Sequence, residues 1–139
     1  MLVRGLEIAV VLAGLAAEAE AADVIVMVER VPNSKGEVHV DLCTDKTFLT
    51  PDCPYDASAP SRKGRVIVTL SNVPPGRYAV TAYHDENANR DLDLNMLGMP
   101  QEAYGFSNDP PMLLGPPLFK DSAFDVGDKT VEVKVRLKR

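Results

Sequence analysis

Alternation of apolar and polar residues along the chain predicts β-strands and little helix. The clearest case is at the C-terminus, where Val131, Val133, Val135 and Leu137 alternate with charged residues. Because a strand turns successive side chains to opposite faces, this period of two is typical of half-buried strands. Alternation predicts strands at residues 37–42, 65–70 and 130–138. We also expect strands at 23–30, which is rich in β-branched residues, and at 78–84, which directly follows a turn.

Turn residues separate these segments. One reversal is expected at Pro32 to Gly36 and another at the sequence Pro74-Pro75-Gly76, because proline fixes φ and glycine supplies the turn. Several short strands joined in this way predict an all-β fold, an antiparallel β-sandwich. The charges interleaved in residues 130–138 are typical of an edge strand.

The first residues follow a different pattern. A positive Arg4 precedes an apolar run at 8–17 and small residues that end near Ala21, as in a secretory signal peptide. The run is shorter than the roughly 20 residues of a membrane-spanning helix. We therefore expect a signal peptide over 1–21, one domain over 22–139 with no transmembrane segment in the mature protein, and a periplasmic or secreted location.

Charge excludes one class of partner. The chain of 139 residues has a formal net charge of −5, and its lysines and arginines are scattered among carboxylates. A phosphate backbone requires a basic stripe, so the composition argues against nucleic-acid binding.

The two cysteines, Cys43 and Cys53, lie close together in the part expected to be exported. An oxidising compartment favours a local disulfide between them. Free or metal-bound thiols are the alternative, although two thiolates fall short of a four-ligand zinc set.

Residues 84–121 form the long loop of this fold, with little periodicity and several prolines. Loops of this length are uncommon unless they have a function or are held by internal contacts. Tyr104 and Phe106 either face a ligand or bury their rings over one end of the sandwich, and burial is the interpretation we favour.

Oxygen-bearing side chains occupy alternate positions at the start of this loop, as in a calcium loop. Calcium takes six to eight oxygen ligands, and alternate residues of a curled loop can direct theirs to one centre. The candidate Ca²⁺ ligands are Asp85, Asn87, Asn89, Asp91 and Asp93.

The match to the calcium-loop pattern is incomplete. Position 6 is Arg90 in place of glycine and position 12 is Met96 in place of glutamate, so a further carboxylate, for instance Glu102, would have to complete the site. The alternative is a solvated turn in which these side chains accept hydrogen bonds from their own backbone.

His84 next to Asp85 suggests a general base oriented by a carboxylate. No glycine-framed serine accompanies it, and a structural histidine at a strand end is the alternative. We therefore expect no enzymatic activity. A small hydrolase that uses His84 is the alternative hypothesis for function.

Several longer motifs resemble the bacterial DUF2141 family. They are Pro74 to Val80, His84 to Asn87, Leu97 to Pro100, Tyr104 to Asn108 and Gly115 to Phe119. Relatives typically carry glycine where this chain has Ala88 and Arg90.

The resemblance implies an exported domain with an immunoglobulin-like or transthyretin-like sandwich. Together with the sequence it suggests a non-catalytic module of the cell envelope that binds a small ligand or an envelope protein through one long ordered loop, with Ca²⁺ as a possible structural cofactor.

Overall fold

The computed structural model describes residues 21–92, 101–112 and 114–139. The expected signal peptide, apart from Ala21, and the candidate ligand Asp93 lie outside these residues. The described elements are β1 (Ala22–Val31), β2 (Glu37–Cys43), β3 (Tyr55–Pro60), β4 (Gly64–Val73), β5 (Gly76–Asp85), β6 (Tyr104–Phe106), α2 (Phe119–Ser122), β7 (Phe124–Val126) and β8 (Val131–Arg136).

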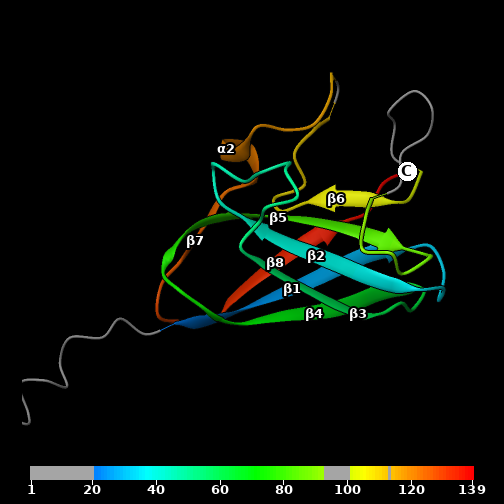
Figure 1. Cartoon of the computed structure of the whole chain (residues 1–139), viewed down its shortest axis with the longest axis horizontal. Coiled ribbons are helices and arrows are strands. Elements are labelled where there is room, and N and C mark those ends of the chain that lie inside the picture. The colour runs from blue at the N-terminus through cyan, green and yellow to red at the C-terminus, as the bar shows by residue number, and fades with distance from the viewer. Residues whose placement is uncertain (1–20, 93–100, 113) are drawn as a thin grey trace, which may run out of the picture.

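Two sheets pack face to face, which confirms the all-β sandwich (Figure 1). One sheet has the strand order β4-β1-β8, and the other has the order β3-β2-β5-β6, with β7 pairing with β5. We call the second one sheet B. Strand β8 lies at an edge of its sheet, as its alternating charges predict.

Small branched side chains fill the space between the sheets. Val24, Val26 and Val28 of β1 are fully buried, and so are Val38 and Val40 of β2. Each set occupies alternate positions of its strand, so the period of two in the sequence becomes one continuous apolar layer.

One strand pair departs from the antiparallel pattern. Strand β1 pairs antiparallel with β4 but parallel with β8, with Val26 opposite Val133 and Val28 opposite Val135. This register keeps the valines of both strands on the inner face. A parallel partner needs a long connection, and here nearly the whole domain lies between β1 and β8.

Strand β3 was not predicted. Its sequence, Tyr-Asp-Ala-Ser-Ala-Pro, has no β-branched residue, yet it pairs along β2 from Leu42 to Glu37. The expected long loop also contains β6 and α2. Phe106 of β6 is buried and its ring lies 5.8 Å from that of Phe48, in agreement with the interpretation as a buried ring, whereas Tyr104 is only half-buried.

The predicted disulfide is present. Cys43 at the end of β2 is bonded to Cys53, which precedes β3. Such a bond is compatible with a periplasmic or extracellular protein. Among the described residues, no helix has the length and apolar character needed to cross a bilayer.

Candidate functional site

The outer face of sheet B gathers polar side chains in cross-strand rows. His39 of β2 lies opposite Ser58 of β3 on one side and Tyr83 of β5 on the other. In the next row of the same face, Asp41 lies opposite Asp56. The registers of β2 with β3 and of β2 with β5 decide which of these side chains are neighbours.

His39 is the centre of this group and is only 3 % exposed. Its Nδ1 atom lies 2.6 Å from Ser58 Oγ, and its Nε2 atom lies 3.1 Å from Asp41 Oδ1 and 3.6 Å from Asp56 Oδ2. The ring centroid is 5.3 Å from that of Tyr83. Both ring nitrogens therefore face defined partners.

The pKa of His39 is raised overall. Burial lowers this pKa, but the hydrogen bond to Asp41 and the charges of Asp41 and Asp56 outweigh burial, while the charge of Arg90 acts against them.

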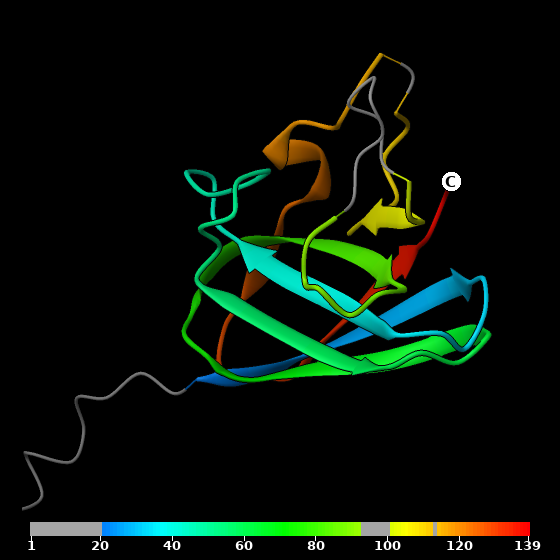
Figure 2. The same cartoon turned by 45° about the vertical axis from the view of Figure 1, so that its right-hand side comes forward.

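The loop that follows β5 lies at the end of β5 and the start of β2 (Figures 1 and 2). Asp85, the last residue of β5, is fully buried. Its Oδ1 accepts a hydrogen bond from the Asn89 amide at 3.2 Å, and its Oδ2 accepts one from the Arg90 amide at 2.6 Å. One carboxylate thus holds the curl of the loop.

Two non-glycine residues of this loop adopt left-handed conformations. Ala88 has φ 54° and Arg90 has φ 62°. Side-chain oxygens support the same curl, because Asn87 Oδ1 accepts from the Asn89 amide at 3.3 Å and Asn89 Oδ1 accepts from the Asp91 amide at 3.0 Å. These bonds are Asx turns, which the solvated-turn alternative also predicts.

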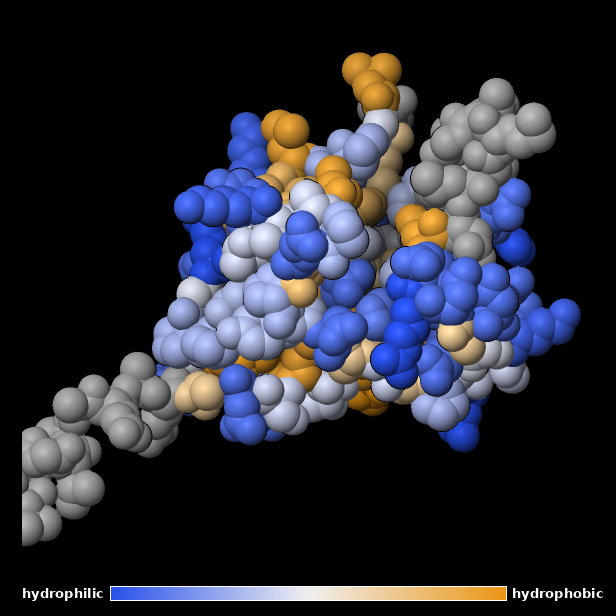
Figure 3. All heavy atoms as spheres, viewed as in Figure 1, coloured by the Kyte–Doolittle hydropathy of each residue, from blue (hydrophilic) through white to orange (hydrophobic). Residues whose placement is uncertain are grey.

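The turn between β1 and β2 supports the base of the loop. Gly36 has φ 64°, and a Cβ atom there would collide with the carbonyl oxygen of Asp85. Asn33 Nδ2 donates to Glu86 Oε1 at 3.2 Å. From the other side Glu102 Oε2 accepts from the Glu86 amide at 2.8 Å. Figure 3 shows hydrophilic side chains gathered over this end of the sandwich.

Several carboxylates act on the hydroxyl of Tyr83 at this end of sheet B. Burial raises the pKa of Tyr83, and the charges of four carboxylates raise it further. Those carboxylates belong to Asp41, Asp85, Asp91 and Glu102.

The candidate Ca²⁺ ligands fall into three groups. Asp85 is buried and bonded to backbone amides, whereas Asn87, Asn89 and Asp91 are exposed on the loop. Asp93 lies outside the described residues. Calcium binding by these residues stays a prediction.

His84 is buried at the end of β5 and is 1 % exposed. Its Nε2 lies 2.7 Å from the Lys35 carbonyl oxygen, and its Nδ1 lies 3.6 Å from Glu86 Oε1. Both nitrogens thus point at protein groups. These contacts are those expected of a structural histidine.

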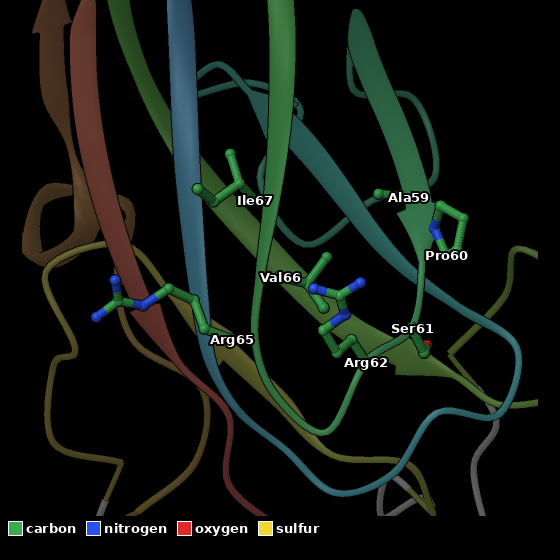
Figure 4. A pocket seen from close by; sticks show the side chains of 7 residues that line it. All are labelled: Ala59, Pro60, Ser61, Arg62, Arg65, Val66 and Ile67. Atoms are coloured by element: carbon green, nitrogen blue, oxygen red, sulfur yellow. The ribbon is translucent and has the colours of Figure 1, made fainter.

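A separate open groove of about 450 Å³ lies where the edge strands β3 and β4 meet (Figure 4). Arg62 extends over Val66, while Arg65 points away across β1, where it lies 3.2 Å from Glu29 Oε2. The groove has no histidine or carboxylate in its lining. The groove therefore lacks the types of side chain that act as general bases or bind metal ions, which the outer face of sheet B has.

Sequence reasoning missed the group around His39. The alternation of β2 already places His39 and Asp41 on one face. Asp56 and Ser58, however, lie in the unpredicted strand β3, and only the β2–β3 register brings them to His39. The available signal was a His-x-Asp spacing within a strand.

Comparison with known proteins identifies the family of this chain but finds no match among curated proteins or solved structures. No curated protein and no solved structure matches the chain. Residues 26–134 match the family described as "Uncharacterized protein conserved in bacteria (DUF2141)", which covers most of the sandwich and the loop after β5. The chain therefore belongs to the DUF2141 family.

Proposed function

We propose that this domain is a non-catalytic, exported module of the bacterial cell envelope whose loop at residues 85–93 binds Ca²⁺ as a structural cofactor. In this proposal the loop-covered end of sheet B faces a small ligand or an envelope protein. The bound cation fixes the shape of that end.

The observation that carries the calcium part is the curl of the loop. Calcium loops need a tight turn at position 6, which is normally glycine. Here Arg90 holds that position with φ 62°, and the Asp85 carboxylate accepts the amides of positions 5 and 6. The turn thus exists without the glycine whose loss weakened the sequence match.

Charge supports the same proposal. The carboxylates that act on Tyr83 include Asp85 and Asp91 of the loop and Glu102, the residue considered as a replacement for the missing glutamate. Glu102 also contacts the loop backbone at Glu86. The negative charge at this end of sheet B would attract a divalent cation.

The positions of the two histidines support a non-catalytic role. His84, the base of the alternative hydrolase, is buried with both nitrogens near protein groups. His39 is held by carboxylates that favour its charged form. Both rings are buried, so neither offers a substrate an accessible nitrogen.

Thermal unfolding of the oxidised mature protein in EDTA, Ca²⁺ or Mg²⁺ tests the proposal. A ligand of the native state stabilises by about 2.7 kcal/mol at one hundred times its Kd. We expect a rise in the midpoint with Ca²⁺ that is larger than with Mg²⁺. Asp91→Ala should abolish it, and Asp128→Ala, a change at another exposed loop aspartate, should not.

Asp91 is the better test residue because Asp85 also braces the backbone, so its loss would perturb the apo fold. No shift at millimolar Ca²⁺, or an equal shift in Asp91→Ala, would refute calcium binding by the loop.

A further inference from the structure

Three potential metal ligands converge on the outer face of β2 and β3, outside the calcium loop. They come from His39 and Asp41, two residues apart on β2, and from Asp56, which lies directly opposite Asp41. One ligand atom from each residue lies within 4.8 Å of the other two. A His-x-Asp pair with a carboxylate on the neighbouring strand puts all three on one face, since strand side chains alternate.

Two of the three ligand separations are close to those around a tetrahedral metal ion. Zinc binds histidine nitrogen and carboxylate oxygen at about 2.0 to 2.2 Å, so two such ligands in a tetrahedral site lie about 3.4 Å apart. Nε2 of His39 lies 3.1 Å from Asp41 Oδ1 and 3.6 Å from Asp56 Oδ2. Small side-chain adjustments would therefore bring these atoms to bonding distance of one ion.

Asp41 and Asp56 lie directly opposite each other on neighbouring strands, so a cation bound to both would be stabilising. Like charges directly opposite each other in a sheet are destabilising. Nε2 of His39 lies within 3.6 Å of an oxygen of each carboxylate. A divalent ion bound to this nitrogen and to both carboxylates would offset their repulsion.

His39 is also oriented as a ligand should be. Metal-binding histidines commonly use their second ring nitrogen to hydrogen-bond a protein group, which fixes the ring. Here Nδ1 lies 2.6 Å from Ser58 Oγ and leaves Nε2 directed at the carboxylates. The Asp56 side chain is 60 % exposed, which gives an ion access from solvent and leaves room for water as a further ligand.

We propose that His39, Asp41 and Asp56 form a binding site for a divalent transition-metal ion, with Zn²⁺ as the probe. One imidazole and two carboxylates are ligands that Zn²⁺ accepts, and the nitrogen ligand distinguishes this site from an all-oxygen calcium loop. The site goes beyond the proposed function and does not depend on it.

Isothermal titration of the tag-free, oxidised, EDTA-treated protein with Zn²⁺ tests the site. We expect one ion per chain. Asp56→Asn should weaken binding by at least about tenfold, and His39→Gln should abolish it. Asp128→Asn, a matched change at an exposed aspartate elsewhere, should leave the Kd unchanged.

Imidazole nitrogen NMR of the unmodified protein covers the case in which His39→Gln fails to fold. Binding should shift His39 Nε2 and leave His84 unchanged. No heat and no His39 shift at millimolar Zn²⁺ would overturn the proposal, as would unchanged affinity in Asp56→Asn.

The calcium-loop variant Asp91→Ala separates the two sites. It should lose the response to Ca²⁺ and keep the Zn²⁺ stoichiometry of one. Loss of Zn²⁺ binding in Asp91→Ala but not in Asp56→Asn would assign the metal to the loop and overturn the site at His39.

Discussion

Replacing Arg90 by glycine should stabilise the protein, because the backbone at this position suits glycine better than arginine. Arg90 has φ 62°. A residue with a Cβ atom loses about 1–2 kcal/mol in this left-handed region, whereas glycine does not. Glycine also makes the unfolded chain more flexible, which costs about 0.4–1 kcal/mol. The difference leaves Arg90→Gly more stable by about 0.5–1 kcal/mol.

A comparison with Arg90→Ala isolates the backbone contribution. Both variants remove the guanidinium charge that acts on His39, but only glycine removes the Cβ atom. The chain has no tryptophan, so urea unfolding is best followed by far-ultraviolet circular dichroism. The urea midpoint of the glycine variant should be the higher one at an unchanged slope.

For a domain of this size the expected gain corresponds to a rise of about 2–4 °C in thermal midpoint. A glycine variant no more stable than Arg90→Ala would show that the left-handed turn carries no strain. The reasoning about position 6 of the loop would then be wrong. The measurement belongs in EDTA, so that metal binding does not contribute.

Two further predictions concern the disulfide and the buried tyrosines. Replacing Cys43 and Cys53 by alanine opens a link across ten residues, which should cost about 2.7 kcal/mol and lower the thermal midpoint by about 10 °C; an unchanged midpoint would contradict this. Burial raises the pKa of Tyr78 and Tyr83 above that of the unfolded chain, about 10. The resulting stability is fully present below that pH and is lost as pH rises through the folded values. Ultraviolet titration of the folded protein should therefore show two tyrosines that ionise at higher pH than the other two. Ionisation of every tyrosine near pH 10 in an intact fold would contradict the assignment.

The conformation of the loop after β5 could be predicted only in part from the sequence. Ala88 and Arg90 both adopt left-handed conformations, at positions where the resemblance to the DUF2141 family implies glycine. Backbone handedness at a tight turn is a local property, so the sequence could predict it. That Asp85 would turn inward and become fully buried depended on packing against the turn at Gly36.

The strands divide in the same way. Period-two alternation predicted β2, β4 and β8, because burial of one face depends only on the order of residues within each strand. β-Branched residues predicted β1, and the Pro-Pro-Gly turn before Tyr78 predicted β5. The ten-residue spacing of Cys43 and Cys53 likewise made their bond a local inference.

Which strands are neighbours depends on long-range packing. The parallel pairing of β1 with β8 and the pairing of the unpredicted β3 with β2 join segments whose own patterns do not name their partners. The cluster of His39 with Asp56 follows from that second pairing, since a shift of one residue in register would move Asp56 to the opposite face. The sequence therefore determined the strands and their inner faces, while the chemistry of the outer face was decided by register, a property of two strands together.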